Sequence, residues 1–486
     1  TTKVKEMKVL KGILRGLMTA RSINGTYTRS EGTMLPGYLP KTRFFGFDED
    51  FDAPGFGFIA GRQYGLDNLY NQAASNGWYT DSSQYLQTPL SSLKNWNLTL
   101  RTELQPIRNF NILVDARKNV SEIREVFYRR PVSEETGFAI PNQPAGPQNP
   151  INTGSMNVST ITLLTAFESR SGNASAAFEQ FIINRQEIQQ QLLNDPRTNP
   201  DQIAGDTTSF KRNSQDVLIP AFLFAYQGRD LSGYKTNRAK AKDLVARIPL
   251  PNWRIDYTGL SDLEFVKRYL SSISISHGYT SAYNVANFSS ALAYETPNQG
   301  FPTIRNERGE YVPYYIVSQV SIIEALTPLI GINFKTKNNI TGRVEFKTAR
   351  NLSLNLSNAQ VTENLMKDFV VGAGYSTSNF RIPFRINGEY KTLKNELTAR
   401  LDLSIRDNVV IQRSIVRDGA TGEKPFNVIT NGSMQLQLRP TVDYTLNQRL
   451  NLQLYFTRTI SDPAISTSFK NTVTEGGVQL RYSLSQ

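Results

Sequence analysis

The 486-residue sequence contains no cysteine and a single histidine, His277. Disulfides, cysteine-based zinc sites, iron–sulfur clusters and thiol nucleophiles are therefore excluded within it. A metal site with several histidines cannot form, and a Ser-His-Asp triad would depend on His277. Catalysis by carboxylates alone stays open, but no such constellation stands out. We therefore predict no catalytic residue, no metal ion, no cofactor and no enzyme activity.

The sequence also lacks any run of the 18 or more apolar residues that a transmembrane helix needs. Its most apolar run, residues 217–226, is interrupted by Pro220. The sequence begins at Thr1 without a signal peptide or an initiator methionine, and we expect it to be a processed or excised piece of a longer chain. The net charge is +12, but no block of Lys and Arg stands out, so we expect no nucleic-acid partner.

From about residue 95 onward, apolar and polar residues alternate, which is the period of a β-strand. We count roughly 14–16 such segments of about 9–12 residues, close to the length that a tilted strand needs to cross a bilayer. Clear examples are residues 96–104, 343–347, 351–357, 400–406, 450–457 and 478–484. Short polar turns at 337–339, 407–408 and 447–448, with long joins elsewhere, are typical of outer-membrane barrels. The sequence thus predicts an all-β, antiparallel fold that forms part of a transmembrane β-barrel, with long loops and a few short helices.

Four regions interrupt this pattern. Residues 131–152 are rich in proline and predict an irregular loop. Residues 168–215 predict a long polar loop with a short helix at 182–193, and residues 235–245 predict a second short, basic helix. Residues 1–18 fit either a basic amphipathic helix on a membrane surface or a strand.

Alternation alone does not distinguish a soluble β-sandwich from a membrane barrel, whose apolar face contacts lipid and whose polar face lines the lumen. Long strands, charged polar faces and aromatic residues at segment ends (127–128, 314–315, 375 and 455–456) favour the barrel. The predicted lipid-facing residues are Val344, Phe346, Leu401, Leu403, Leu452, Leu454 and Phe456. The predicted lumen-facing residues are Arg343, Glu345, Lys347, Arg400, Asp402, Arg406 and Gln453.

Three further features have both a functional and a structural interpretation. His277 could be a proton-sensitive or catalytic residue, but a girdle or turn position before Gly278 explains it better. The acidic residues of 48–52 could bind calcium, but their spacing matches no calcium loop, and we expect a solvated acidic loop. Gly372 and Gly374 lie within a predicted strand, where glycine indicates a bend or close packing more often than a cofactor.

Seven segments of the sequence, taken together and in order, indicate a protein family more specifically than any one of them does alone. In order they are SINGTYTRSEGTMLPGY (22–38), APGFGFIAGRQ (53–63), DVLIPAFLFAYQG (216–228), PLPNWRIDYTGL (249–260), ISISHGYTSAYNVANF (273–288), PLIGINF (328–334) and SDPAISTSFKNTVTEGGVQLRYSL (461–484). Together they resemble the C-terminal part of the SprA/Sov family. These are the giant outer-membrane translocon barrels of the type IX secretion system in Bacteroidetes, which also support gliding motility. The sequence departs from that family in its short length and in ending without a terminal aromatic residue.

The resemblance implies that residues 1–486 are the C-terminal portion of one very large barrel at the cell surface. The implied function is that of a protein-conducting translocon. Secreted cargo with a C-terminal signal would pass through its lumen and a lateral opening. The implied partners are the remainder of the same chain, a small PorV-type outer-membrane barrel, a plug protein, the cargo proteins and outer-membrane lipid. The residues alone leave two alternatives open, a smaller porin or transporter barrel and a soluble extracellular β-sheet protein that binds polysaccharide.

Overall fold

The computed structural model describes residues 19–80, 86–130, 146–168, 173–196, 208–234, 248–291, 304–307, 309–386, 388–418, 422–447 and 449–483, with a few positions between 133 and 140. The segment at 1–18 and the basic helix expected at 235–245 lie outside these residues, as does most of 131–145. Within the described residues, no helix combines the length and the apolar character that a membrane span requires.

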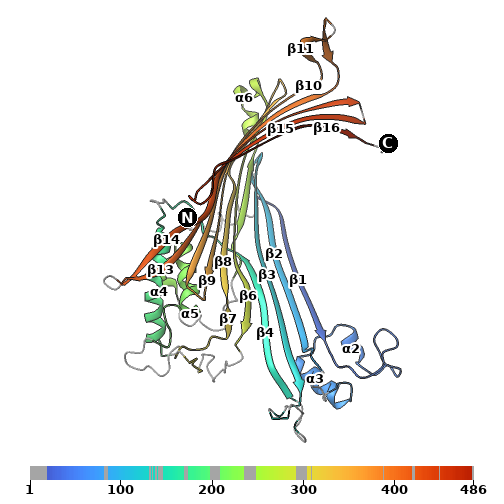
Figure 1. The fold of residues 1–486 in the computed structure, drawn as a ribbon. Coiled ribbons are helices and arrows are strands. Elements are labelled where there is room, and N and C mark those ends of the chain that lie inside the picture. Colours follow the sequence, from blue (N-terminus) through green and yellow to red (C-terminus); the bar gives the residue numbers. More distant parts are fainter. Residues whose placement is uncertain are drawn as a thin grey trace, which may run out of the picture.

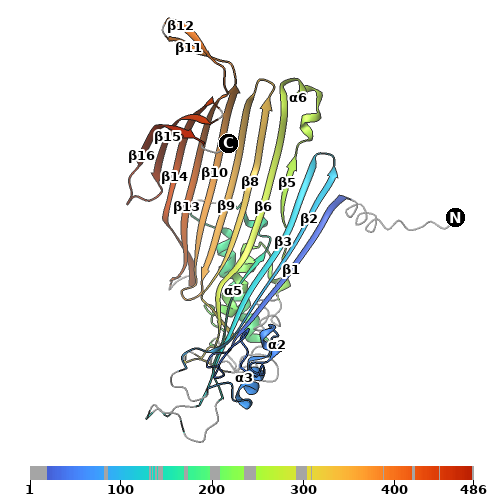
Figure 2. The same ribbon diagram turned by 90° about the vertical axis from the view of Figure 1, so that its right-hand side faces the viewer.

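One antiparallel sheet of 14 strands forms the body of the described chain (Figures 1 and 2). Its strands lie side by side in the order β1, β2, β3, β4, β6, β8, β9, β10, β13, β14, β15 and β16, with the short β5 and β7 pairing beside them. The predicted mostly-β, antiparallel fold is confirmed. Within the described residues, β1 and β16 are the two edges of this sheet, each with one partner.

The strand bounds are as follows: β1 Ala20–Met34, β2 Leu90–Ile107, β3 Phe110–Arg129, β4 Gly146–Ser159, β5 Asn252–Tyr257, β6 Leu270–Ser290, β7 Tyr315–Val317, β8 Gln319–Thr336, β9 Ile340–Asn355, β10 Gln360–Thr377, β13 Leu397–Asp418, β14 Gly422–Asn447, β15 Leu450–Pro463 and β16 Asn471–Tyr482. A separate hairpin consists of β11 (Phe380–Ile386) and β12 (Glu389–Leu393). The helical elements are α2 Phe56–Ile59, α3 Leu66–Ser75, η1 Leu163–Thr165, α4 Ala176–Asn194, α5 Gln215–Tyr226, η2 Leu231–Gly233, η5 Gly259–Asp262 and α6 Glu264–Tyr269.

The strands are longer than predicted, with 22 residues in β13 and 26 in β14. The turn predicted at 407–408 is wrong, because β13 runs straight through it. Asp407 pairs with Lys367 on β10 and with Met434 on β14, so neighbouring strands satisfy its backbone groups. The turn predicted at 337–339 is confirmed, since it separates β8 from β9. Of the turn predicted at 447–448, Asn447 ends β14 and residue 448 lies outside the described residues.

The proline-rich loop is shorter than the predicted 131–152, because β4 already begins at Gly146. Pro147 and Pro150 fit this strand because residues 146–152 of β4 pair with β3 alone, and β6 joins β4 only from Thr153 onward. A strand that is locally an edge tolerates proline, since the missing N–H has no neighbour to bond.

The two ends of the sheet differ in how they connect the strands. At one end, here called the turn end, short turns at 108–109 and 337–339 join β2 to β3 and β8 to β9, and β15 begins at Leu450, three residues after β14 ends at Asn447. This end, at the top of Figure 2, also carries α6 and the β11–β12 hairpin. At the opposite loop end, the connections at 35–89, 130–145 and 291–314 are long, whereas residues 356–359 join β9 to β10 in a short turn.

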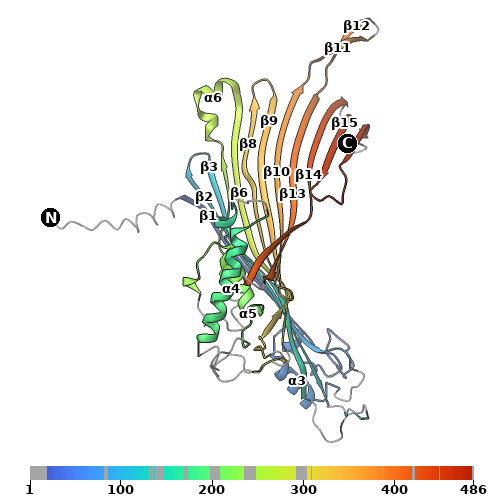
Figure 3. The ribbon, with the colours of Figure 1, turned by 60° about the vertical axis from the view of Figure 1, so that its left-hand side comes forward.

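Residues 160–251, here called the helical insert, join β4 to β5 and cover one face of the sheet toward its loop end (Figure 3). α4 contains the predicted 182–193 helix, but its 19 residues make it much longer than predicted. It starts at Ser175, whose hydroxyl accepts the Phe178 N–H at 3.2 Å. α5 was not predicted, because its side chains are apolar all round and show no period, and because Pro220 argues against a helix.

The main hydrophobic core lies between the insert and the sheet. The sheet contributes Val120, Met156, Val158, Tyr283, Val285, Val320, Ile322, Leu352, Leu354 and Val361. The helices contribute Phe178, Phe181, Ile188, Val217, Leu218, Ala221, Phe222 and Ala225. Full burial of one large apolar side chain stabilises a fold by about 1.5–3 kcal/mol. The insert therefore stabilises the loop-end half of this sheet face by removing its apolar side chains from water.

A second, smaller core lies at the loop end of β2 and β3, beneath α3. Tyr128 stacks on Tyr70 there, with ring centroids 4.1 Å apart. Tyr315 packs edge-on against Tyr314 and Phe288, at 4.5 and 4.6 Å between ring centroids. Of the aromatic residues predicted as a girdle at 127–128 and 314–315, Tyr128, Tyr314 and Tyr315 therefore pack against other rings at the loop end. The girdle prediction is wrong for Tyr128, which is buried, because strand-end position does not reveal which elements cover a ring.

Candidate functional site

The two faces of the large sheet have opposite character. Successive side chains along a strand point to opposite faces, and directly paired residues on adjacent strands share a face. We call the side that carries Leu352 and Leu354, beneath the insert, the helix-covered face, and the opposite side the open face. The register of each strand pair assigns the other residues.

The two sets of residues singled out in the sequence lie on opposite faces. Arg343, Glu345, Lys347, Arg400, Asp402, Arg406 and Gln453 lie on the open face. Val344, Phe346, Leu401, Leu403, Leu452, Leu454 and Phe456 lie on the helix-covered face. Which face contacts lipid stays a prediction.

An apolar belt crosses the helix-covered face on the turn-end side of the insert. It comprises Ile23, Leu100, Ile255, Ile275, Ile332, Val344, Phe346, Phe369, Val371, Leu401, Leu403, Ile405, Leu436, Leu438, Leu454, Phe456, Val478 and Leu480. Ile23, Leu401 and Leu480 are 71%, 46% and 61% exposed. About twelve strands spaced 4.8 Å apart give a band about 25 Å tall an area on the order of 1,000 Å². Soluble monomers rarely expose apolar patches above a few hundred Å².

Charged residues mark where the belt ends toward the loop end. Along the helix-covered face they are Lys367 on β10 and Asp407 on β13, which pair with each other, whereas Arg458 on β15 pairs with Leu438 of the belt itself. On β13 the apolar stretch runs from Leu397 to Ile405. These residues span about 26 Å along the strand at about 3.3 Å per residue. A strand tilt of about 35–45° reduces this to a height of about 19–22 Å, close to the ~25 Å apolar band of outer-membrane barrels.

A buried polar network, here called the Arg350 network, lies between the belt and the core of the insert. The Arg350 Nε atom donates to the Glu324 carboxylate at 2.6 Å, and both side chains are at most 5% exposed. The guanidinium also donates to the Thr162 and Thr165 carbonyl oxygens of the insert, at 3.0 and 2.8 Å. Glu324 accepts hydrogen bonds from the Thr162 and Tyr279 hydroxyls at 2.6 and 2.8 Å. The network thus attaches the start of the insert to three strands.

A second buried ion pair attaches the insert near the start of α4. The Arg413 Nε atom donates to Glu363 at 2.8 Å, and a guanidinium nitrogen also donates to the Asn173 carbonyl oxygen. Both charged side chains are fully buried. Sequence reasoning missed Glu324, Arg350, Glu363 and Arg413. The available signal was a charge of each sign at an apolar position of the alternation, on strands that later proved to be neighbours.

Burial affects two ionisable groups of α5. Desolvation raises the pKa of the Asp216 carboxyl to about 6, despite its place in the first turn of the helix. Desolvation, with Glu363 nearby, also raises the pKa of the Tyr226 hydroxyl. The insert buries a further charge besides its two ion pairs with the sheet, since Arg185 of α4 is fully buried and its Nε–H donates to the Arg212 carbonyl oxygen at 3.0 Å.

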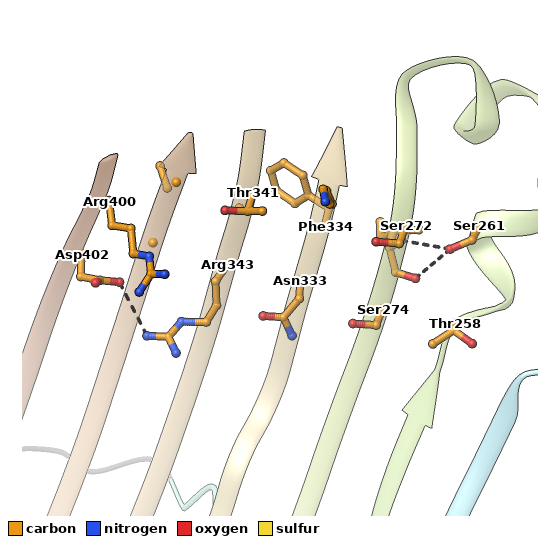
Figure 4. A pocket seen from close by; sticks show the side chains of 16 residues that line it. Thr258, Ser261, Ser272, Ser274, Asn333, Phe334, Thr341, Arg343, Arg400 and Asp402 are labelled. Carbon is orange, nitrogen blue, oxygen red and sulfur yellow. Dashed lines mark hydrogen bonds and ion pairs between the residues drawn. The ribbon is translucent and has the colours of Figure 1, made fainter. Parts of the chain in front are cut away.

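The open face carries a shallow pocket near the turn end, shown in Figure 4. Its volume is about 370 Å³, and Arg343 and Arg400 project into it beside Asp402. Arg343 approaches Asp402 to 3.8 Å across β10, and a Cβ on Gly372 would come within 2.9 Å of that carboxylate. The glycine therefore permits close packing, as predicted. The pocket has charges of both signs and suits a hydrated surface.

The other two candidates from the sequence, His277 and the acidic residues of 48–52, make hydrogen bonds that stabilise the local fold. His277 lies inside β6 rather than at a turn, and its Nδ1–H donates to the Leu329 carbonyl oxygen at 2.7 Å. Asp48 accepts the backbone N–H groups of Asp52 and Ala53, at 2.9 and 3.1 Å, and so caps its own loop. Among the residues that the structure describes, no three Asp, Glu or His side chains gather where they could hold a metal ion.

No family model matches the sequence, and no curated protein matches it. Among solved structures, the outer membrane channel DcaP of Acinetobacter baumannii is similar over 95% of this chain and 96% of that chain. The sequence identity is 9% and the TM-score is 0.12. The likeness to an outer-membrane channel is weak, and a TM-score of this size carries no argument about the fold or family of this chain.

Proposed function

We propose that residues 1–486 form part of the wall of a transmembrane β-barrel in the outer membrane. The observation that carries this proposal is the exposed apolar belt, backed on the same strands by a charged and polar open face. In lipid the belt lies in the hydrocarbon and the open face lines a wet lumen. The alternative of a soluble extracellular sheet leaves the belt in water, which is unfavourable for an area of this size.

The lengths of the connections give the orientation of the wall. Outer-membrane barrels have short turns on the periplasmic side and long loops outside the cell. The turn end is therefore periplasmic, and the loop end with the helical insert is extracellular. Beyond the membrane there is no lipid to cover the helix-covered face. The insert covers its apolar residues there and keeps them out of water. One face of β6, β8, β9 and β10 is thus covered by lipid in one half and by helices in the other.

We propose further that the wall belongs to a protein-conducting translocon of the type IX secretion system. The support is the resemblance of seven segments, together with two open edges at β1 and β16 within the described residues. Open edges suit a barrel completed by more strands, contributed by the remainder of the same chain. Cargo with a C-terminal signal then passes along the open face and leaves laterally toward a PorV-type barrel, with a plug protein at the periplasmic end. A complete, smaller porin is the alternative.

A pair of adjacent positions on β9 tests the translocon function. We expect a photo-crosslinking amino acid at Arg343, on the open face, to capture secreted cargo in cells that contain the full-length protein. The same amino acid at Val344 points to the other face and serves as the matched control. We expect it to capture lipid or partner barrels, but not cargo. Equal capture of cargo at both positions, or at neither, contradicts the proposal.

The edges also predict how the isolated segment behaves. An unpaired strand edge in hydrocarbon leaves backbone N–H and C=O groups without partners, at a cost of several kcal/mol each. We therefore expect residues 1–486, expressed alone, to aggregate or to be degraded in an outer membrane. The measurement is electron microscopy of the detergent-extracted segment. A monodisperse, closed barrel would favour the smaller porin.

A further inference from the structure

The extracellular insert carries two exposed apolar side chains near the border of the belt. Leu164, in η1, is 78% exposed, and Phe167, three residues later, is 58% exposed. Both lie beside Thr165, which the Arg350 network holds against β9. The other apolar side chains of this stretch, Ile161, Leu163 and Ala166, are half-buried, so the exposure of Leu164 and Phe167 requires another explanation.

Their distance from the belt is short. Arg350 and Phe346 lie on the same face of β9, four residues apart, which is about 13 Å at 3.3 Å per residue. Phe346 belongs to the belt, whereas Arg350 contacts the turn that bears Leu164. The exposed pair therefore lies at the height where the belt gives way to polar surface, next to the extracellular border of the proposed membrane band.

The segment next to Leu164 carries a cation. A Cβ on Gly228 would come within 2.8 Å of the Leu164 Cβ atom, so the two chain segments are in contact. The next residue, Arg229, is exposed, with its guanidinium 5.1 Å from the Phe224 ring centroid. Asp230, the neighbouring anion, accepts the Ser232 N–H at 2.9 Å. Apolar side chains with an adjacent arginine match the layer of a bilayer where acyl chains meet phosphate groups.

We infer that Leu164, Phe167 and Arg229 form a foot by which the insert rests on the headgroup layer of the outer membrane. This inference rests on the proposed function, since it takes the belt to be in lipid. Leu164 and Phe167 enter the boundary between acyl chains and headgroups, and Arg229 pairs with lipid phosphate. The foot fixes the height of the insert above the bilayer and supports the Arg350 network from outside.

Site-directed spin labelling tests the foot, and the absence of cysteine from this segment makes it convenient. The full-length protein, with any other cysteines replaced, carries a nitroxide at Phe167→Cys, Ile183→Cys or Leu401→Cys. The labelled proteins are placed in nanodiscs of phosphatidylcholine and phosphatidylglycerol. Ile183, 50% exposed on α4, is the aqueous control, and Leu401 reports the belt. Oxygen concentrates in lipid and a nickel chelate stays in water, so their collision rates locate each label.

We expect the ratio of oxygen to nickel collisions to be several-fold higher at positions 167 and 401 than at position 183. If position 401 is in lipid but position 167 is in water, the foot is wrong and the proposed barrel wall stands. If position 401 is itself in water, the proposed function fails and the foot fails with it. A label at position 167 that is shielded from both reagents means that a protein covers the pair, which also overturns the inference.

Discussion

Leu403→Arg is expected to impair assembly of the barrel far more than a charged substitution at the adjacent residue. Leu403 lies in the middle of the belt, paired with Val371 on β10 and Leu438 on β14. An arginine at the lipid midplane of a barrel costs about 2–4 kcal/mol. The measurement is the amount of heat-modifiable, folded full-length protein recovered from the outer membrane at equal expression.

Asp402→Arg is the matched control, because it places the same side chain one residue away on the opposite face. Asp402 is already hydrated there, and its pair with Arg343 at 3.8 Å is exposed. Loss of such a pair costs at most about 1 kcal/mol. We therefore expect the Asp402→Arg protein to assemble nearly normally. Equal tolerance of both substitutions would mean that the helix-covered face does not contact lipid.

Strict alternation allowed the faces to be predicted from the sequence, but not the length of the strands. Residues 343–347 and 351–357 look like two segments because Arg350 interrupts the apolar positions, yet β9 includes nearly all of both. In the same way, Asp407 and Asn408 look like a turn because both are polar. A strand that leaves the membrane needs charged residues on its lipid-facing side, and a local pattern cannot distinguish that border from a turn.

Most of the helical insert could not be predicted from the sequence. Period two identifies strands with one wet face, whereas α5 is buried on every side and its sequence has no period. Likewise, Arg350 and Glu324 are 26 residues apart, and only the register of β8 and β9 reveals that they face each other. The apolar residues next to them on the same face are covered by helices. In the sequence they look the same as lipid-facing residues, because helices and lipid both require an apolar strand face.

Arg350→Met is expected to loosen the insert from the sheet. The substitution keeps most of the side-chain volume but leaves the Glu324 carboxylate buried without its cation, and it removes the hydrogen bonds to Thr162 and Thr165. Removal of one partner of a buried ion pair costs about 3–5 kcal/mol. We expect faster proteolysis within residues 160–251 of the full-length protein, at a temperature where the sheet stays intact.

Two further variants separate the lost ion pair from a general defect. Arg343→Met makes the same change on the open face of β9, where the arginine is 46% exposed, and should leave proteolysis of the insert unchanged. Glu324→Gln combined with Arg350→Met removes both charges but keeps an amide oxygen that can accept from Thr162 and Tyr279. Because an unpaired buried charge costs more than a neutral hydrogen-bonded group, the double variant should recover much of the resistance lost in Arg350→Met alone. If the double variant is as sensitive as Arg350→Met, the hydrogen bonds of the guanidinium hold the insert and the ion pair does not.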